Sequence, residues 1–145
     1  MSESEIADET ANIKMAQSLY AAFSRGDIAM VLRGCTPDIE WHAGGRREDF
    51  PTFGPRKGIQ QVQEFFQAVA QFERFTEFSP KEFYAQRDKV FALGTLSVTL
   101  TSNERQLSSE WIHIITFRRG KVARFREFLD TAAYVAAYRG DGTLS

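Results

Sequence analysis

Cysteine is nearly absent from this sequence: Cys35 is the only one among 145 residues, which excludes a disulfide within the chain. No Cys-x-x-Cys or His-x-x-x-His spacing occurs, so the sequence offers no ready metal site. We therefore expect neither a metal nor another cofactor. A chain without a disulfide suits a reducing compartment, and we expect a cytoplasmic location.

Long apolar runs and an excess of charge of one sign are also missing. No stretch approaches the roughly 20 apolar residues that span a bilayer, and the first five residues are acidic where a secretory signal would be basic. The net charge of -1 and the pI near 6.1 give no overall positive field. We therefore expect no membrane and no nucleic acid as partner, and a small molecule is the better candidate.

Aromatic residues, in contrast, are abundant. Thirteen phenylalanines among 43% hydrophobic residues are more than a plain core requires, which predicts a cavity or a subunit interface. Several aromatics stand beside the two histidines, in Trp41-His42 and in Trp111-Ile112-His113. A polar group in an aromatic interior is either a satisfied structural residue or part of a binding site. The pattern predicts a hydrophobic pocket for a small hydrophobic molecule.

The first half of the chain shows helical periodicity twice. Apolar residues recur at helical spacing around Leu19 and again around Phe65. The segment between these helices contains glycine, proline and a run of charges, which predicts an irregular surface loop and a candidate lid over 44–57. In order, we expect a helix over 4–24, a short helix capped by Asp27 through about 32, a strand over 39–43, this loop, and a helix over 58–71.

The second half favours strands, because β-branched and aromatic residues are frequent and the connections are of hairpin length. We expect strands over 82–86, 90–101, 106–117 and 121–129, forming an antiparallel meander, and then a helix over 131–138. Helices followed by a meander predict one α+β domain, 1–145, whose helices cover one face of a curved antiparallel sheet. Both alternating sets of residues 111–117 are largely apolar, which predicts a homodimer formed through the other sheet face.

The order of short motifs along the chain resembles a known family. These motifs are Leu19-Tyr20-Ala21-Ala22-Phe23 with Arg25-Gly26-Asp27, then Pro37-Asp38-Ile39-Glu40-Trp41, then Gly58 with Phe65-Phe66, and finally Gly120-Lys121-Val122 leading to Glu127-Phe128-Leu129-Asp130. In this order they resemble the SnoaL-like group of the NTF2-like superfamily. The resemblance implies the cone-shaped α+β fold shared by ketosteroid isomerases, polyketide cyclases and limonene epoxide hydrolases. It does not fix a reaction, since one fold serves many functions.

The resemblance also indicates candidate catalytic residues. His113 stands where ketosteroid isomerases carry a protonated aspartate, and Glu127 stands where several polyketide cyclases carry an acidic residue. A short turn at Arg119-Gly120 would pair His113 with Arg126, so a one-residue bulge is needed for His113 and Glu127 to share a face. Such a bulge is suggested because Val122 and Phe125 both look inward. The alternatives are a histidine bonded to backbone and a surface glutamate.

The remaining candidates have competing structural interpretations. Asp130 is a candidate catalytic acid by resemblance, but a helix N-cap by its position before Thr131. Trp41 should point inward, where ketosteroid isomerases carry their proton-shuttling aspartate, and His42 should then point outward. Tyr20 resembles a cavity residue of the first helix, or is a packed tyrosine. The candidate ligand-binding residues are Tyr20, Trp41, Phe65, Phe66, Trp111 and Phe125.

Two functions remain open from the sequence. The first is a cofactor-independent enzyme that transfers a proton on a hydrophobic substrate, as an isomerase, a cyclase-like lyase or a hydrolase would, with Glu127 or His113 moving the proton. His113 or Tyr20 would then steady the developing oxyanion. The second is a non-catalytic module that binds a hydrophobic ligand or dimerises.

Overall fold

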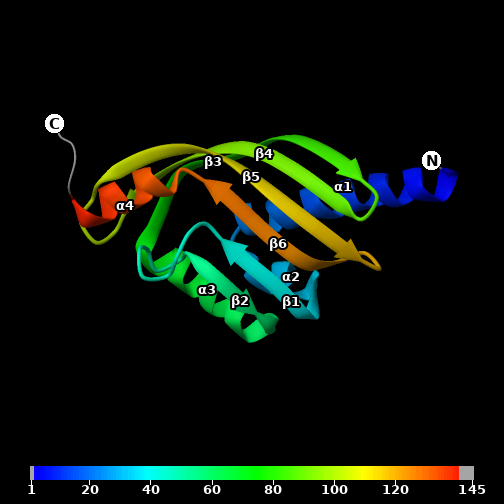
Figure 1. The fold of residues 1–145 in the computed structure, drawn as a ribbon, viewed down its shortest axis with the longest axis horizontal. Coiled ribbons are helices and arrows are strands. Elements are labelled where there is room, and N and C mark those ends of the chain that lie inside the picture. The colour runs from blue at the N-terminus through cyan, green and yellow to red at the C-terminus, as the bar shows by residue number, and fades with distance from the viewer. Residues whose placement is uncertain (1, 141–145) are drawn as a thin grey trace.

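A computed structural model describes residues 2–140 of the chain (Figure 1). The fold is α+β, as the sequence predicts. The elements are α1 (Glu3–Ser24), α2 (Ile28–Arg33), β1 (Cys35–Ala43), β2 (Gly54–Lys57), α3 (Gly58–Phe72), β3 (Glu73–Gln86), β4 (Lys89–Leu100), β5 (Gln106–Arg118), β6 (Lys121–Leu129) and α4 (Thr131–Arg139). Among residues 2–140, no helix has the length and apolar character needed to cross a membrane.

The strands form one sheet in the order β2-β1-β6-β5-β4-β3. Strands β3 to β6 make the predicted antiparallel meander. The predicted antiparallel sheet is mostly antiparallel in the structure and contains one parallel pair, because β1 runs parallel to β6, with Trp41 opposite Phe125. Hairpin-length turns reveal pairing between consecutive strands, but β1 and β6 are far apart in sequence, so no turn signals their pairing.

Three predicted ranges differ clearly from the structure, and the first is β1, which begins at Cys35 and not at residue 39. Strand β3 begins at Glu73, not at residue 82. Phe72, Phe75 and Phe78 are spaced by three residues, which imitates a helix, and β3 also carries register shifts that interrupt strict alternation. The sequence signal for this strand was therefore lost over its first nine residues.

The predicted surface loop over 44–57 is also partly wrong. Residues Gly54–Lys57 form β2, which pairs with β1. Phe50, Thr52 and Phe53 are buried instead of lying over the surface. Phe50 and Phe53 pack against each other and against Tyr134 of α4, with ring centroids 5.2–5.5 Å apart. This segment therefore closes one end of the core.

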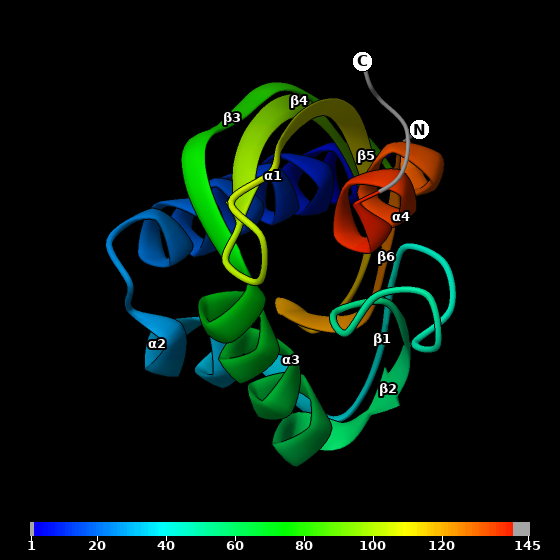
Figure 2. The same ribbon diagram turned by 90° about the vertical axis from the view of Figure 1, so that its left-hand side faces the viewer.

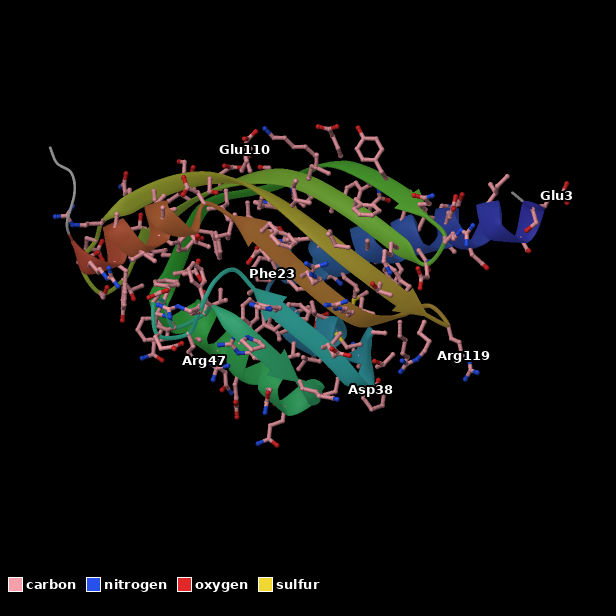
Figure 3. All side chains as sticks on the ribbon, in the orientation of Figure 1. Glu3, Phe23, Asp38, Arg47, Glu110 and Arg119 are labelled. Carbon is pink, nitrogen blue, oxygen red and sulfur yellow. The ribbon has the colours of Figure 1, made fainter. Side chains whose placement is uncertain are left out.

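The helices and the curved sheet surround the core (Figure 2). One cluster of buried apolar residues lies where α1, α3, β1 and β6 meet, and includes Trp41, Phe66 and Phe125. A second cluster, around Trp111 and Tyr134, lies toward α4. Phe23 of α1 points into the interior, whereas Glu110 of β5 lies on the outer face of the sheet (Figure 3).

The outer face of the sheet leaves large apolar side chains accessible. Ile112 and Phe128 lie opposite each other on β5 and β6, and they are 42% and 48% exposed. Leu93 of β4 lies opposite Ile112 in the same row. This row is the face for which the sequence predicts a second subunit.

Candidate functional site

A β-bulge in β6 places His113 and Glu127 on the same side of the sheet. Near the hairpin, Arg118 pairs with Lys121 and Phe117 with Val122, but Thr116 pairs with Arg124. The ladder has therefore shifted by one residue, and His113 lies opposite Glu127 instead of Arg126. The bulge predicted from the inward positions of Val122 and Phe125 is confirmed, since both side chains are buried.

Three polar side chains form a hydrogen-bonded chain from α1 across β5 to β6. The hydroxyl of Tyr20 is 2.6 Å from Nδ1 of His113, and Nε2 of His113 is 2.7 Å from Oε2 of Glu127. With a neutral imidazole, the Tyr20 hydroxyl donates to Nδ1 and the Nε2–H donates to the Glu127 carboxylate. The interpretations of His113 as backbone-bonded and of Glu127 as a surface residue are both wrong.

Aromatic rings hold the imidazole of His113 in place. The ring of Trp111 stacks on it at a centroid distance of 4.1 Å, and Phe125 meets it edge-on at 4.6 Å. Phe78 stacks on Trp111 at 4.9 Å, and its ring lies 6.4 Å from the imidazole. Gly94 lies opposite Trp111 on β4, and a Cβ there would collide with the indole ring and with the carbonyl of Ser79. The absence of a side chain at residue 94 thus makes room for this stack.

The chain of polar groups forms part of the wall of a cavity of about 100 Å³. Its lining is mostly apolar. The lining residues come from all four helices, from the face of the sheet that these helices cover, and from the buried segment 52–53. Most ligand sites in proteins measure roughly 300–1,000 Å³, so this cavity is small. It has room for several water-sized spheres, and a ligand that fits without movement of side chains must be compact.

Burial and charge act on the groups of this wall. Burial, and after it the charge of Glu127, raise the pKa of Tyr20 well above its ordinary value. Tyr20 therefore keeps its proton and remains a hydrogen-bond donor at neutral pH.

A second polar group, which the sequence analysis missed, lines the same cavity. Glu73 is 8% exposed, and the Tyr134 hydroxyl donates to its Oε1 over 2.9 Å. Burial raises the pKa of Glu73 to about 7, although hydrogen bonds from Tyr134 and Thr52 oppose the rise, and the charge of Glu127 adds to it. No sequence signal distinguishes Glu73 from Arg74 and Glu77, the other charged residues between Phe72 and Phe78.

Arg56 fixes the backbone beside this second group. It is buried, and its guanidinium donates to the carbonyls of Pro51 and Thr52 at 3.0 and 2.9 Å. Burial lowers the pKa of Arg56 to about 10, so it remains charged at neutral pH. Its hydrogen bonds hold Thr52 in the wall of the cavity, next to Tyr134.

The predicted ligand-binding residues mostly line the cavity. Five of the six do so, namely Tyr20, Trp41, Phe65, Phe66 and Phe125. Trp111 is the exception. Its indole stacks on the imidazole of His113, and its Nε1–H donates to the carbonyl of Thr95. Trp111 thus supports the imidazole and does not line the cavity.

The other two candidates lie outside the cavity lining. Asp130 caps α4, and its Oδ1 accepts a hydrogen bond from the amide of Ala133. The N-cap interpretation is confirmed. His42 is exposed on β1 and lies 3.3 Å from the carbonyl oxygen of Gly45, as expected from the inward position of Trp41. Among residues 2–140, no group of three or more His, Cys, Asp or Glu side chains could hold a metal ion.

Comparison with known proteins places these observations in a family context. The model of the SnoaL-like domain matches residues 16–125, which include Tyr20 and His113 and stop two residues before Glu127. No curated protein matches the sequence.

Solved structures match over nearly their whole length. An NTF2-like protein from Burkholderia xenovorans is 29% identical, with a TM-score of 0.81 over 89% of this chain and 96% of that one. An NTF2-like protein of unknown function from Burkholderia pseudomallei is 26% identical, with a TM-score of 0.79 over 88% and 96%. TerC, crystallised with polyporic acid, is 28% identical, with a TM-score of 0.77 over 89% and 98%. The NTF2-like fold predicted from the sequence is confirmed.

Proposed function

Because this chain belongs to the SnoaL-like domain family, we propose that it is an enzyme that transfers a proton within a compact, hydrophobic, carbonyl-containing molecule. The observation that carries the proposal is the chain of hydrogen bonds through Tyr20, His113 and Glu127 in the wall of an apolar cavity. Ionisable groups that burial and hydrogen bonding orient toward a cavity are typical of sites for acid–base catalysis. The reaction is isomerase-like, cyclase-like or hydrolase-like and requires no cofactor.

The central step is removal of a proton from the carbon beside a carbonyl group. The Glu127 carboxylate takes this proton, the electron pair of the C–H bond forms a C=C bond, and the π pair of the carbonyl group moves onto its oxygen to give an enolate. In an isomerisation, Glu127 returns the proton to a different carbon. In a cyclisation, the enolate carbon instead attacks a second carbonyl, and the oxygen formed there accepts the proton.

His113 and Tyr20 support this step in different ways. The Nε2–H of His113 orients the Glu127 carboxylate, and its aromatic neighbours fix the plane of the imidazole. Tyr20 keeps its proton and donates it to Nδ1 of His113, which fixes the second nitrogen of the imidazole. To stabilise the negative oxygen of the enolate, Tyr20 or His113 has to turn its proton from the present partner, Nδ1 of His113 or Oε2 of Glu127, to that oxygen.

The small cavity restricts the substrate. A volume of about 100 Å³ favours a single six-membered ring over a fused-ring system. TerC was crystallised with polyporic acid, which supports a small organic molecule as the ligand of this fold. We accordingly choose cyclohexanone as the test compound.

Exchange of the α-protons of cyclohexanone in D₂O, followed by proton NMR, tests the proposal. We expect the protein to accelerate the exchange, and His113→Gln and Glu127→Gln to reduce the acceleration by about 100-fold or more. His42→Gln and Glu40→Gln are matched controls, because both residues are exposed on β1. Failure of the protein to exceed the buffer rate, or equal rates in all four variants, would contradict the proposal.

The alternative is a non-catalytic module that binds a hydrophobic ligand, and the mostly apolar lining favours it. Binding of cyclohexanone is measured separately by saturation-transfer NMR. Binding without accelerated exchange, with the same affinity in His113→Gln, would support this alternative.

The homodimer is a further part of the proposal. The row of half-buried Leu93 and exposed Ile112 and Phe128 on the outer face of the sheet would become buried against a second copy. The cavity lies on the other side of the sheet, so dimerisation would leave it open to ligand.

A further inference from the structure

Glu73 is a buried carboxyl group without a basic partner among residues 2–140. The structure gives it two hydroxyl partners, Tyr134 from α4 and Thr52 from the segment before β2. A carboxylate in such a place is costly, and a hydrophobic residue or a glutamine would fill the space at lower cost. Stability therefore gives no reason for a carboxyl group at residue 73.

The position of Glu73 gives it access to the cavity. Glu73, Thr52 and Tyr134 line the same cavity as His113 and Glu127. The cavity thus has two polar regions separated by apolar wall, one around His113 and one around Glu73. Both regions belong to the wall of one cavity of about 100 Å³, so one small molecule can reach both.

The protonation of Glu73 decides what it can do there. With a pKa of about 7, its carboxyl group carries a proton over much of the neutral and acidic range. Tyr134 donates to Oε1, so the proton resides on Oε2. A protonated carboxyl group is a hydrogen-bond donor, which suits a ligand carbonyl or hydroxyl oxygen.

We propose that Glu73, held by Tyr134, binds an oxygen atom of the ligand, and that the substrates are compact apolar rings with two oxygen functions, one for each polar region. This inference rests on the proposed use of the cavity and adds the substrate class. One oxygen function lies at His113 and Glu127, where the proton is moved. The other accepts a hydrogen bond from Glu73, which sets the orientation of the ring.

A matched pair of compounds isolates the second oxygen. Cyclohexanone and 1,4-cyclohexanedione share a six-membered ring and differ by one carbonyl group. Dissociation constants for both are measured by NMR titration at pH 6. We expect the dione to bind about 3- to 10-fold more tightly, as one added hydrogen bond predicts.

Variants of Glu73 then test whether Glu73 is the group that binds the second carbonyl oxygen of the dione. Glu73→Leu should reduce the preference for the dione to less than about twofold, whereas Glu73→Gln should retain most of it because the amide also donates. Glu77→Gln is the control, since Glu77 lies on the same strand with hydroxyl partners but faces solvent. Thermal unfolding followed by circular dichroism confirms that each variant is folded, and Glu73→Gln covers the case in which Glu73→Leu fails to fold.

The pH dependence separates ligand recognition from a purely structural role. The preference of the wild-type protein for the dione should fall as the pH rises through about 7, because Glu73 loses its donor proton, and Glu73→Gln should show no such fall. The titratable groups that also face the cavity are Tyr20 from α1, Cys35 from β1, His113 from β5, Glu127 from β6 and Tyr134 from α4.

The outcomes distinguish the two proposals. Equal affinity of the wild-type protein for both compounds, an unchanged preference in Glu73→Leu, or no binding of either compound would overturn the role of Glu73. These results come from affinities, whereas the proposed function is decided by α-proton exchange and by the variants of His113 and Glu127. Either proposal can therefore fail without the other.

Discussion

Glu127 lies directly opposite His113 on the neighbouring strand, and its Oε2 is 2.7 Å from the imidazole Nε2. The side chain of His113 is 4% exposed and that of Glu127 is 14% exposed, so bulk water reaches this pair only at the glutamate. A hydrogen bond in such surroundings is stronger than one in water, and loss of either partner leaves a buried polar group unpaired. The pair therefore stabilises this wall of the cavity, and in the proposed function it also moves the proton.

Tyr20→Phe tests how far the stability and the proposed activity of the His113–Glu127 pair depend on the Tyr20 hydroxyl. The change removes the hydroxyl at 2.6 Å from Nδ1 and leaves that nitrogen unpaired in an apolar wall. We expect a loss of about 1–2 kcal/mol in the free energy of unfolding and a decrease in α-proton exchange of about 10-fold. Urea denaturation and NMR exchange measure the two effects. Tyr84→Phe, on the outer face, is the control, and equal behaviour of the two variants would contradict the prediction.

The position of His113 and Glu127 on the same face of the sheet was predictable from particular residues. Val122 and Phe125 are separated by three positions, so strict alternation cannot bury both, and a bulge is the solution that the hydrophobic pattern demands. The helices around Leu19 and Phe65 were predictable for a similar reason, because their apolar residues recur at helical spacing.

Glu73 and Thr52 could not be found in this way. Glu73 lies at the junction of α3 and β3, where the phenylalanine spacing imitates a helix. Thr52 lies in a segment whose glycines, prolines and charges are typical of a surface loop, and hydrogen bonds from Arg56 to its backbone keep it inside. Both depend on tertiary contacts between distant segments, which local sequence patterns do not encode.

The raised pKa of Glu73 predicts that stability depends on pH. Its pKa rises from 4.5 to about 7 in the folded protein, so the folded state binds a proton that the unfolded chain has already released in this range. Glu73 therefore makes its full contribution to the free energy of unfolding below about pH 4.5. This contribution is lost as the pH rises through 7, and the total loss is roughly 3 kcal/mol.

Glu73→Gln tests this dependence. In this variant the free energy of unfolding should no longer decrease as the pH rises through 7, so the variant should be more stable than the wild-type protein at pH 8. Urea denaturation between pH 5 and pH 8 measures this. Glu77→Gln should keep the wild-type profile over the same range. A profile of Glu73→Gln that runs parallel to that of the wild-type protein would show that Glu73 does not titrate near pH 7.

Gly94→Ala should disturb the support behind His113. The added methyl group would meet both the Trp111 ring and the Ser79 carbonyl, so the indole or the strand has to shift. We expect a loss of about 1–3 kcal/mol in the free energy of unfolding, typical of overpacking, together with weaker α-proton exchange. Gly45→Ala is the matched control, because a Cβ there has ordinary contacts, the nearest at 3.5 Å. Equal stability of the two variants would contradict the prediction.

Asp130→Ala separates helix capping from catalysis. Loss of the hydrogen bond to the Ala133 amide should lower the free energy of unfolding by about 1 kcal/mol, measured by thermal or urea denaturation. Because Asp130 lies outside the cavity lining, exchange measured well below the melting temperature should stay within about twofold of the wild-type rate. A larger loss would instead assign Asp130 to the proton-transfer groups.

Ile112→Lys should separate the two copies of the proposed dimer. The side chain is 42% exposed in the single chain and lies opposite Phe128, at the centre of the apolar row on the outer face of the sheet. Burial of an ammonium group against its symmetry mate is unfavourable, because both charges would lose water and repel each other. Sedimentation velocity should show the wild-type protein at twice the 16.5 kDa of one chain and the variant at the mass of one chain. Ile6→Lys, at another exposed isoleucine, on α1, should leave the dimer intact, and a wild-type protein that sediments as a single chain would refute the proposed interface.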